Sequence, residues 1–241
     1  MILSGKQIIV FGNTSEITKQ ILLKISEANA QQLIFCCEEE PPDLDIPNLN
    51  IFQFNSTTDD ASDQLTELLQ MKIRFDGVVF AGGMGGIRPA KLNNRSFVSQ
   101  MFERNVFSFL EIIRFLLKKR LLNPGASIVA LSSVSSIKGL KSKSAYSASK
   151  AALDAAVRGI AAELSAKQIR VNSIQKGWVS SDMDLSFIKS NTAISKEDDF
   201  SRQLLGAIEP EEVANLAVFL LSDSVKTLTG QAIVLDGGYT L

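Results

Sequence analysis

Tyr146 and Lys150, which begin and end the segment Tyr-Ser-Ala-Ser-Lys, have the types and spacing that most clearly indicate chemistry. Positions i and i+4 share one face of a helix, so the phenol and the ammonium group can lie side by side. A neighbouring cation favours the phenolate form, and such a tyrosine can act as a general acid or base. The same spacing also occurs on solvated helix faces, so the pair alone leaves both interpretations open.

The absence of histidine restricts the alternatives. The chain has 241 residues, 25 basic and 26 acidic side chains, a formal net charge of −1 and no His. Without imidazole it can form no Ser-His or Cys-His nucleophile pair and no His-ligated zinc site, and we expect no metal. A net charge near zero gives no long-range attraction for nucleic acid or an anionic membrane surface. Proton transfer is therefore left to Tyr, Lys, Cys, carboxylates or water.

Apolar runs and segments of helical periodicity alternate along the whole chain. The apolar, β-branched runs predict strands that are buried on both faces, and the intervening periodicity predicts helices. The strands are expected at 7–11, 32–37, 49–54, 77–80, 127–131, 170–174 and 232–235, and the helices at 15–28, 58–70, 96–120, 145–166 and 210–221. Such alternation is typical of right-handed crossovers between parallel strands. We therefore predict an α/β fold in which residues 1–241 form a single-domain, doubly wound Rossmann fold. Its seven-stranded parallel sheet would have helices on both faces.

Two segments depart from the alternation. Residues 38–48 contain three of the six prolines, which favours a loop or a single turn over a full helix. Residues 180–205 form a long, mostly polar stretch after a strand, a place where long segments often cover a substrate. We expect this segment to be a substrate lid with scattered apolar residues, namely Phe187, Ile188, Ile194 and Phe200.

The sequence gives no indication of a membrane span or of secretion. Lys6 interrupts the first apolar stretch, and no uncharged apolar run approaches the roughly 18 residues of a membrane helix. Cys36 and Cys37 are adjacent, so their Cα atoms lie about 3.8 Å apart, too close for an ordinary disulfide. We expect a cytoplasmic, soluble protein without a disulfide.

Several separated motifs together resemble one family. Ser132-Ser133 stand at a strand end before the Tyr146 to Lys150 segment, and Asn105 lies within the long expected helix. The run Ile-Arg-Val-Asn-Ser-Ile precedes Gly177, and Asp-Gly-Gly follows the last strand. The chain resembles the short-chain dehydrogenase/reductase family, and within it the 3-oxoacyl-[acyl-carrier-protein] reductases. The resemblance implies an NAD(P)-dependent oxidoreductase that interconverts a ketone and a secondary alcohol by hydride transfer.

The resemblance also implies catalytic roles. Tyr146 would protonate the carbonyl oxygen or deprotonate the alcohol, and Lys150 would support the phenolate and contact the nicotinamide ribose. Ser133 would polarise the substrate carbonyl, although a turn-forming role within its serine-rich stretch is the alternative. Asn105 would hold a water of the proton relay. It could instead be a solvated helix residue, but its apolar neighbours favour a buried, hydrogen-bonded side chain.

The expected cofactor site departs from the family pattern at the first turn. Gly12 is present, but Glu16 and Thr18 occupy the positions of the other two glycines. The Glu16 carboxylate would repel a diphosphate, or would face solvent at the positive end of the helix. A relative that has lost cofactor binding and acts as an oligomeric scaffold or regulatory protein is therefore the alternative to an enzyme. The resemblance places the cofactor contacts at Gly12, Thr14, Ser15, Ile17, Cys37, Asn55, Ala81, Gly82, Tyr146, Lys150, Gly177, Val179 and Ser181.

The end of the second expected strand favours NAD over NADP. Cys37 stands at the usual acidic position and Glu38 to Glu40 follow, with no Lys or Arg close by to bind a 2′-phosphate. The expected partner is a small carbonyl or alcohol substrate, and a link to acyl-carrier protein would follow from the resemblance. Lys118, Lys119 and Arg120 could contact such an acidic carrier, or complement a helix dipole. The resemblance further implies a homodimer or homotetramer, with no nucleic-acid or membrane partner.

Overall fold

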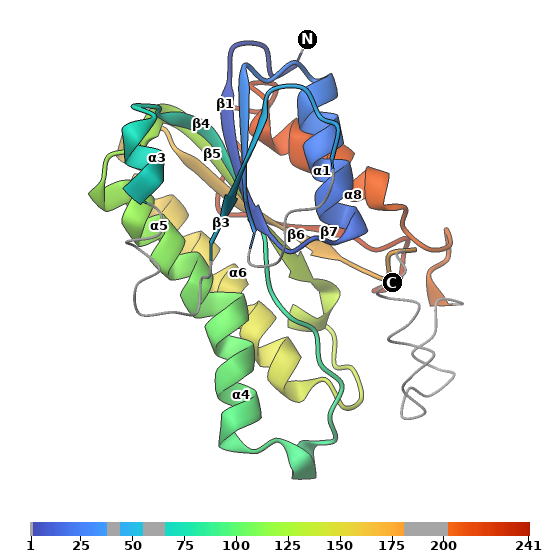
Figure 1. The fold of residues 1–241 in the computed structure, drawn as a ribbon. Helices are drawn as coiled ribbons and strands as arrows, with labels where there is room; N and C mark the ends of the chain where they lie inside the picture. The colour runs from blue at the N-terminus through green and yellow to red at the C-terminus, as the bar shows by residue number, and fades with distance from the viewer. Residues whose placement is uncertain (1, 38–43, 55–65, 181–201) are drawn as a thin grey trace.

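A computed structural model describes residues 2–37, 44–54, 66–180 and 202–241. Within these ranges seven parallel strands form one sheet in the order β3-β2-β1-β4-β5-β6-β7 (Figure 1). The strands are β1 (Gln7–Gly12), β2 (Gln32–Cys37), β3 (Leu49–Gln53), β4 (Phe75–Ala81), β5 (Leu122–Ser133), β6 (Arg170–Lys176) and β7 (Ala232–Leu235). The predicted α/β doubly wound sheet is confirmed.

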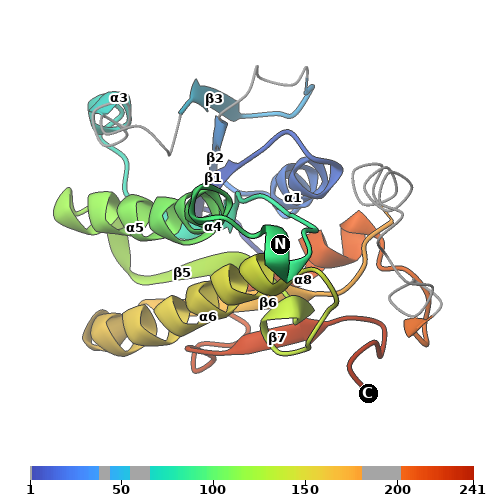
Figure 2. The same ribbon diagram turned by 90° about the horizontal axis from the view of Figure 1, so that it is seen from below.

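Helices cover both faces of this sheet. The described helices are α1 (Glu16–Glu27), α3 (Thr66–Gln70), α4 (Arg95–Phe102), α5 (Ser108–Lys118), α6 (Ser144–Leu164) and α8 (Pro210–Leu221). Figure 2 shows α1 and α8 on one side of the strands and α4, α5 and α6 on the other. Short 3-10 turns cover Ala90–Leu92, Val134–Ser136 and Ser165–Lys167.

Side chains that alternate along the strands build a separate apolar core on each face. In β1, Ile9 and Phe11 join the cluster beneath α5 and α6, whereas Ile8 and Val10 join the cluster beneath α1 and α8. Successive strand residues point to opposite faces, so a continuous apolar run supplies both cores. This arrangement explains why the central strands read as uninterrupted apolar runs.

Two features differ from the sequence prediction. The edge strands β3 and β7 are only partly buried, because each has a neighbour on one side alone. The helix predicted over 96–120 is divided by a π-helical turn at Glu103–Phe107, which separates α4 from α5. Within the predicted loop 38–48, residues 44–48 contain no helix, and residues 38–43 lie outside the described ranges.

The strand order reverses between β1 and β4. In open α/β sheets, ligands bind at the carboxyl ends of the strands where such a reversal occurs.

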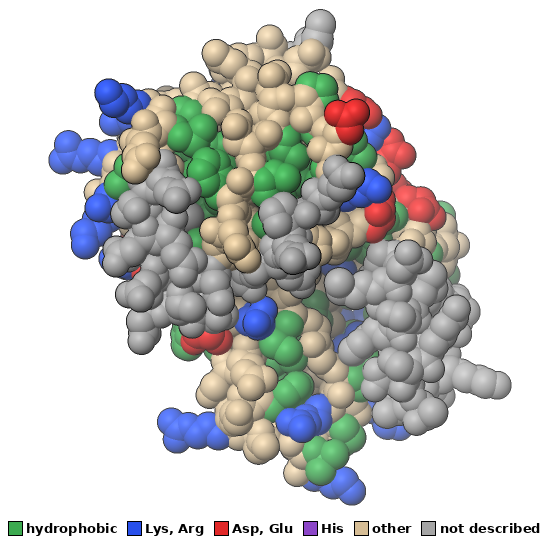
Figure 3. Space-filling model, viewed as in Figure 1, with side chains coloured by type: hydrophobic (Ala, Val, Ile, Leu, Met, Phe, Trp, Pro, Cys, Tyr) green, Lys and Arg blue, Asp and Glu red, His purple; other side chains and the backbone are tan. Residues whose placement is uncertain are grey.

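On the face shown in Figure 3, acidic side chains gather over α1 and α8, where Lys24 pairs with Glu27 and Glu211. Among the residues that the structure describes, no helix is long and apolar enough to cross a membrane.

Candidate active site

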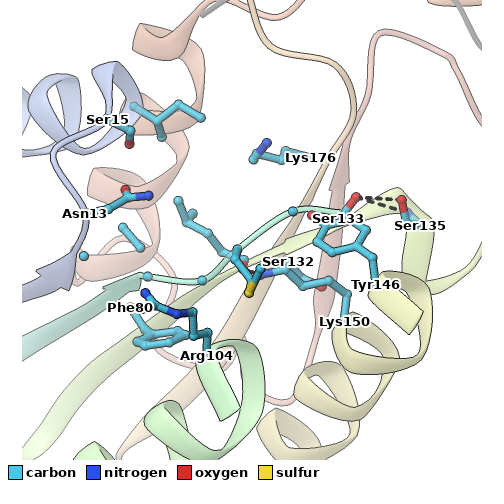
Figure 4. Close-up of a pocket in the computed structure, with 18 of the residues that line it drawn as sticks. Asn13, Ser15, Phe80, Arg104, Ser132, Ser133, Ser135, Tyr146, Lys150 and Lys176 are labelled. Carbon is cyan, nitrogen blue, oxygen red and sulfur yellow. Dashed lines mark hydrogen bonds between the residues drawn. The ribbon is translucent and has the colours of Figure 1, made fainter. Parts of the chain in front are cut away.

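A cavity of about 440 Å³ lies at this carboxyl edge. Its walls come from the ends of β1, β4, β5 and β6 and from the start of α6 (Figure 4). Ligand cavities in proteins typically measure about 300–1,000 Å³, so this one can take a small organic ligand or part of a larger one. The structure therefore brings residues from several separated segments together at the place where the fold predicts a ligand.

The turn after β1 forms one end of the cavity. A Cβ atom at Gly12 would lie 3.2 Å from the Ala81 Cβ and 3.3 Å from the Thr18 Oγ1, so the turn is closely packed. Ser15 caps α1, and its hydroxyl accepts a hydrogen bond from the Thr18 amide at 3.3 Å. Asn13 lines the cavity, and its Oδ1 atom is buried without a hydrogen-bond partner among the described residues.

Glu16, which replaces a family glycine, does not line this cavity. Its carboxylate accepts a hydrogen bond from Gln20 Nε2 at 2.9 Å and lies 4.0 Å from the Lys19 ammonium along the exposed side of α1. An acidic residue in the first turn of a helix is also favourable to the helix dipole. The carboxylate is thus directed along the helix surface, which agrees with the solvent-facing interpretation of Glu16.

Tyr146 and Lys150 lie in the first two turns of α6 and both line the cavity. The Lys150 Nζ is 6.0 Å from the centre of the Tyr146 ring and donates a hydrogen bond to the Leu131 carbonyl at 2.9 Å. The first turns of α6 therefore place a phenol and an amine on the same side of the helix. The solvated-face interpretation of Lys150 is wrong, because this side chain is only 5 % exposed.

Burial and a nearby cation affect the charge of Lys150. Desolvation, together with the charge of Lys176, lowers the pKa of its ammonium to about 7, and the Asp154 carboxylate opposes this shift. Asp154 lies one helical turn after Lys150 and accepts hydrogen bonds from Ser173 Oγ at 2.7 Å and Gln175 Nε2 at 2.8 Å. The sequence analysis missed Asp154, although its i+4 spacing from Lys150 was the available signal.

Ser133 ends β5 on the same side of the cavity as Tyr146 (Figure 4). Its hydroxyl accepts a hydrogen bond from the Ser135 amide at 3.2 Å and donates one to the Ser135 hydroxyl at 3.2 Å. Ser133 therefore caps the following 3-10 turn while its side chain remains at the cavity wall. The two interpretations of Ser133, as a turn former and as a site residue, are compatible in this geometry.

Asn105 is fully buried in the π-helical turn between α4 and α5. Its Oδ1 accepts from the Met84 amide at 2.8 Å, and its Nδ2 donates to the Met84 carbonyl at 3.0 Å and to Ser149 Oγ at 2.9 Å. A Cβ at Gly83, whose φ is +128°, would lie 2.4 Å from the Asn105 Oδ1. Asn105 thus joins the loop after β4 to α6, beneath the cavity.

The expected cofactor contacts fall into three groups. Those that line the cavity are Gly12, Ser15, Ile17, Ala81, Gly82, Tyr146, Lys150 and Gly177. Thr14, Cys37 and Val179 do not line it, and Cys36 does so in place of Cys37. Cys37 is completely buried with the α1 side of the core, because adjacent strand residues point to opposite faces. Asn55 and Ser181 lie outside the described residues, as does most of the expected lid at 180–205.

Comparison with known proteins identifies the family. A family model described as "Enoyl-(Acyl carrier protein) reductase" matches residues 13–240. An uncharacterized oxidoreductase of Bacillus subtilis is 30% identical over 193 residues, which are 80% of this chain and 77% of that protein. The chain belongs to the short-chain dehydrogenase/reductase family. As a family member it is an oxidoreductase that acts on alcohol and carbonyl groups.

Relatives that cover the full length show the breadth of this family. A 3-oxoacyl-[acyl-carrier-protein] reductase of Thermotoga maritima is 29% identical over 260 residues and covers 100% of both chains. A crystal structure of a short chain dehydrogenase family protein from Francisella tularensis has a TM-score of 0.85 at 26% identity, covering 98% of this chain and 99% of that one. These similarities assign the family, but sequence identities of 29% and 26% do not identify the substrate.

Some cavity residues depart from the short-chain dehydrogenase/reductase pattern or escaped the sequence analysis. Phe80 stands at the family's asparagine position, is buried against Phe109 with ring centres 5.4 Å apart, and lines the cavity. Lys176 replaces the proline before Gly177 and also lines the cavity. Lys143 and Trp178 line it as well, and their positions directly beside the recognised motifs were the available signal.

Proposed function

We propose that this protein interconverts a ketone and a secondary alcohol by hydride transfer with NAD or NADP, and that Tyr146 is the general acid/base. The observation that carries the proposal is the cavity shared by Tyr146, Ser133 and Lys150 beside the turn after β1. A phenol, a hydroxyl donor and a buried amine around one space are suited to a substrate oxygen that gains or loses a proton.

The described residues fit a nicotinamide dinucleotide. Gly12 lines the cavity at the end of β1, and the Glu16 carboxylate lies outside the cavity. The amino end of a helix attracts phosphate groups through its free amides and dipole. Gly12, Ser15 and Ile17 would hold the cofactor at this end, and Lys150 and Gly177 would contact its nicotinamide half. When bound, the cofactor supplies or accepts the hydride.

The protein side chains would handle the substrate oxygen. The Ser133 hydroxyl, which donates to the Ser135 hydroxyl in this structure, would turn to donate its hydrogen bond to the substrate oxygen. Tyr146 would protonate this oxygen during reduction or take its proton during oxidation. The Lys150 ammonium stabilises the Tyr146 phenolate that results. Both amide hydrogens of Asn105 are used by Met84 and Ser149, so a relay water can be held only through the Asn105 Oδ1 or the neighbouring main chain.

A preference for NAD over NADP is part of the proposal. It rests on Cys37 at the end of β2 and on Glu38 to Glu40 in the following sequence, which offer no cation for a 2′-phosphate. The measurement that checks it is the ratio of the dissociation constants for NADH and NADPH. Tighter binding of NADPH would contradict the preference without affecting the reaction.

The resemblance suggests a more specific substrate, namely a 3-oxoacyl-[acyl-carrier-protein]. Lys118, Lys119 and Arg120 lie at the carboxyl end of α5, just before the amino end of β5, whereas the cavity lies at the carboxyl ends of the strands. A carrier bound to these residues would be at the opposite edge of the sheet from Tyr146. They are better explained as complements to the α5 dipole, so a carrier protein would need another surface.

We also propose that the protein is a cytoplasmic homodimer or homotetramer. Phe107 at the end of the π-helical turn and Leu110 on α5 are large apolar side chains that are 51% and 39% exposed. Burial of these side chains against a second copy would remove them from water. Light scattering after gel filtration would measure the assembly, and a monomer at micromolar concentration would contradict the proposal.

The proposed reaction is tested by cofactor titration followed by turnover. Trp178 is the chain's single tryptophan and lines the cavity, so its fluorescence should change when NADH or NADPH binds. Tyr146→Phe should then abolish turnover of an accepted ketone and leave cofactor binding largely intact. Tyr239→Phe, which removes the chain's other phenolic hydroxyl away from the cavity, is the matched control and should remain active.

Two outcomes would contradict this function. Binding of neither cofactor at millimolar concentration would favour the scaffold or regulatory alternative. Turnover that persists in Tyr146→Phe would remove Tyr146 from its proposed role, while leaving hydride transfer itself in place.

A further inference from the structure

A chain of hydrogen bonds joins β6, α6 and the 3-10 turn that follows Ser133. Its centre is Gln175 on β6, which is 3% exposed and does not line the cavity. The Gln175 Nε2 donates to the Asp154 Oδ2 at 2.8 Å and to the Ser136 Oγ at 2.7 Å. A carboxamide nitrogen carries two hydrogens, so both donors of Gln175 are used. One side chain therefore links three elements that carry or support the site.

The α6 end of this chain is the buried carboxylate of Asp154. Asp154 lies four residues after Lys150 and eight after Tyr146, so all three share one face of α6. Its Oδ1 accepts a second hydrogen bond from β6, from the Ser173 Oγ at 2.7 Å. Because a carboxylate accepts hydrogen bonds, Gln175 must present its nitrogen and not its oxygen to α6. Asp154 thus fixes the orientation of Gln175 and resists rotation of α6 against β6.

The other end of the chain is the backbone of Ser133. The Ser136 Oγ accepts from Gln175 and donates to the Ser133 carbonyl at 2.8 Å. Within the same turn, the Ser133 Oγ accepts from the Ser135 amide and donates to the Ser135 Oγ (Figure 4). The orientation of the Ser133 hydroxyl therefore depends on the turn, and Gln175 holds the turn from outside.

The sheet itself stops short of this turn. The last register pair between β5 and β6 is Ser133 with Lys176, so the backbone ladder of the two strands does not continue into Val134–Ser136. Gln175 supplies an anchor beyond the end of the ladder, and the same side chain is tied to α6. The distance between the end of β5 and the first turns of α6 is thus set in part by side chains outside the cavity.

We propose that Gln175 is a positioning residue for the reaction, which fixes the Ser133 hydroxyl relative to Tyr146. It is held by Asp154 and acts through Ser136. A displacement of about 1 Å in a reacting geometry can cost about a hundredfold in rate, so such an anchor affects turnover without touching the substrate. The inference rests on the proposed function, because Ser133 and Tyr146 define the position of the reacting oxygen.

Steady-state kinetics of two variants test this role, with ethyl acetoacetate and cyclohexanone as probes at saturating cofactor. Gln175→Met keeps the side-chain length and removes both donors. It should lower kcat by about ten- to a hundredfold and change KM and the cofactor dissociation constant by less than about threefold. Ser136→Ala breaks the link to Ser133 and keeps the hydrogen bond between Gln175 and Asp154. It should lower kcat by about tenfold without depriving a buried carboxylate of a donor.

Asn172→Leu is the matched control. Asn172 is a fully buried amide on the same strand, three residues before Gln175. Its Nδ2 donates to the Leu228 carbonyl at 2.8 Å and its Oδ1 accepts from the Gln231 amide at 3.1 Å, and none of these residues lines the cavity. Asn172→Leu should lower the unfolding temperature as Gln175→Met does, yet keep kcat within about threefold of wild type. An equal loss of kcat in both variants would overturn the role of Gln175.

A double-mutant cycle with Ser133→Ala shows whether Gln175 acts through Ser133. Once the Ser133 hydroxyl is absent, its position no longer matters. Gln175→Met should therefore lower kcat by less than about threefold further in the Ser133→Ala protein. If the two substitutions multiply as independent effects, Gln175 does not act through Ser133 and the inference is overturned.

Amide exchange of residues 133–137, measured by mass spectrometry, separates this inference from the proposed function because it needs no substrate. Gln175→Met should raise the exchange rate of this turn by about tenfold or more, and Asn172→Leu should leave it unchanged. An unchanged rate in Gln175→Met would overturn the inference even if kcat falls. Faster exchange in a protein that reduces neither probe would support the anchoring of the turn and contradict the proposed reaction.

Discussion

Replacement of Lys150 by Met should make the ligand-free protein more stable at neutral and acidic pH. Lys150 is buried, and desolvation together with the charge of Lys176 lowers the pKa of its ammonium from 10.5 to about 7. A lowered lysine pKa means that the folded state disfavours the charged form relative to the unfolded state. The folded protein therefore carries an electrostatic cost that an apolar side chain of similar length would remove.

The magnitude follows from the difference between the two pKa values. The interval from 10.5 to about 7, at about 1.4 kcal/mol per pH unit, corresponds to a cost of about 5 kcal/mol. Met cannot donate to the Leu131 carbonyl, which Lys150 contacts at 2.9 Å, and an unpaired buried carbonyl costs about 1–3 kcal/mol. The expected gain in the free energy of unfolding of Lys150→Met is therefore about 2–4 kcal/mol at pH 6.

The sign of the pH dependence distinguishes this explanation from simple repacking. Below pH 7 the lysine is charged in both states and the whole cost is present. Between about 7 and 10.5 the folded protein releases the proton before the unfolded chain does, so the wild-type stability rises relative to the variant. Above that interval the charge-related difference disappears, and only the lost hydrogen bond remains.

Urea unfolding of both proteins at several pH values from 6 to 10 would measure this difference. The pH dependence of wild-type stability alone cannot isolate the contribution of Lys150, because burial also raises the pKa of the Cys36 thiol. The folded protein loses stability for this second reason when the thiol ionises in the unfolded chain. Subtraction of the two curves cancels that contribution, since both proteins contain Cys36. A difference between wild type and Lys150→Met that stays constant from pH 6 to 10 would refute the reasoning.

Three further predictions concern the loop after β4 and the first turn. Gly83→Ala should lower the free energy of unfolding by about 2 kcal/mol or more in urea, because its φ is +128° and its Cβ would lie 2.4 Å from the Asn105 Oδ1. Gly85→Ala, with no atom within 4 Å, is the control and should change little. Asn105→Ala should cost about 2–3 kcal/mol by the same assay, since it removes the side-chain partner of both partly buried Met84 backbone groups. Glu16→Gln should change the NADH dissociation constant less than threefold, because the carboxylate lies along the exposed side of α1; a tenfold improvement would place its charge at the cofactor.

The strands could be predicted because their sequence requirements are local. β1 and β2 appear as apolar runs that serve two cores, so their positions follow from composition over a few residues. The π-helical turn at Glu103–Phe107 could not be predicted in the same way. It coincides with Asn105, whose partners Met84 and Ser149 are distant in sequence, and only the assembled fold brings them together.

The site was predictable where a motif has fixed spacing. It was less predictable where membership of the site depends on the face of the sheet to which one side chain points. Tyr146, Lys150 and Ser133 share the cavity because α6 and the end of β5 impose their relative positions. Cys37 was expected at the cofactor, but the cavity is lined by Cys36. A shift of one residue along a strand moves a side chain to the other face of the sheet, so this error reverses the environment completely.

The turn after β1 shows why lost glycines need not remove a binding site. In sequence, Glu16 suggests repulsion of a diphosphate and Thr18 suggests a steric obstacle. In the structure the Glu16 carboxylate contacts its own helix, and the Thr18 hydroxyl lies 3.0 Å from the capping Ser15 hydroxyl. Phosphate binding at a helix start depends mainly on backbone amides, which both substitutions retain, although the Thr18 amide donates to the Ser15 hydroxyl in this structure. The two residues therefore affect how α1 is capped and packed, and neither of them lines the cavity.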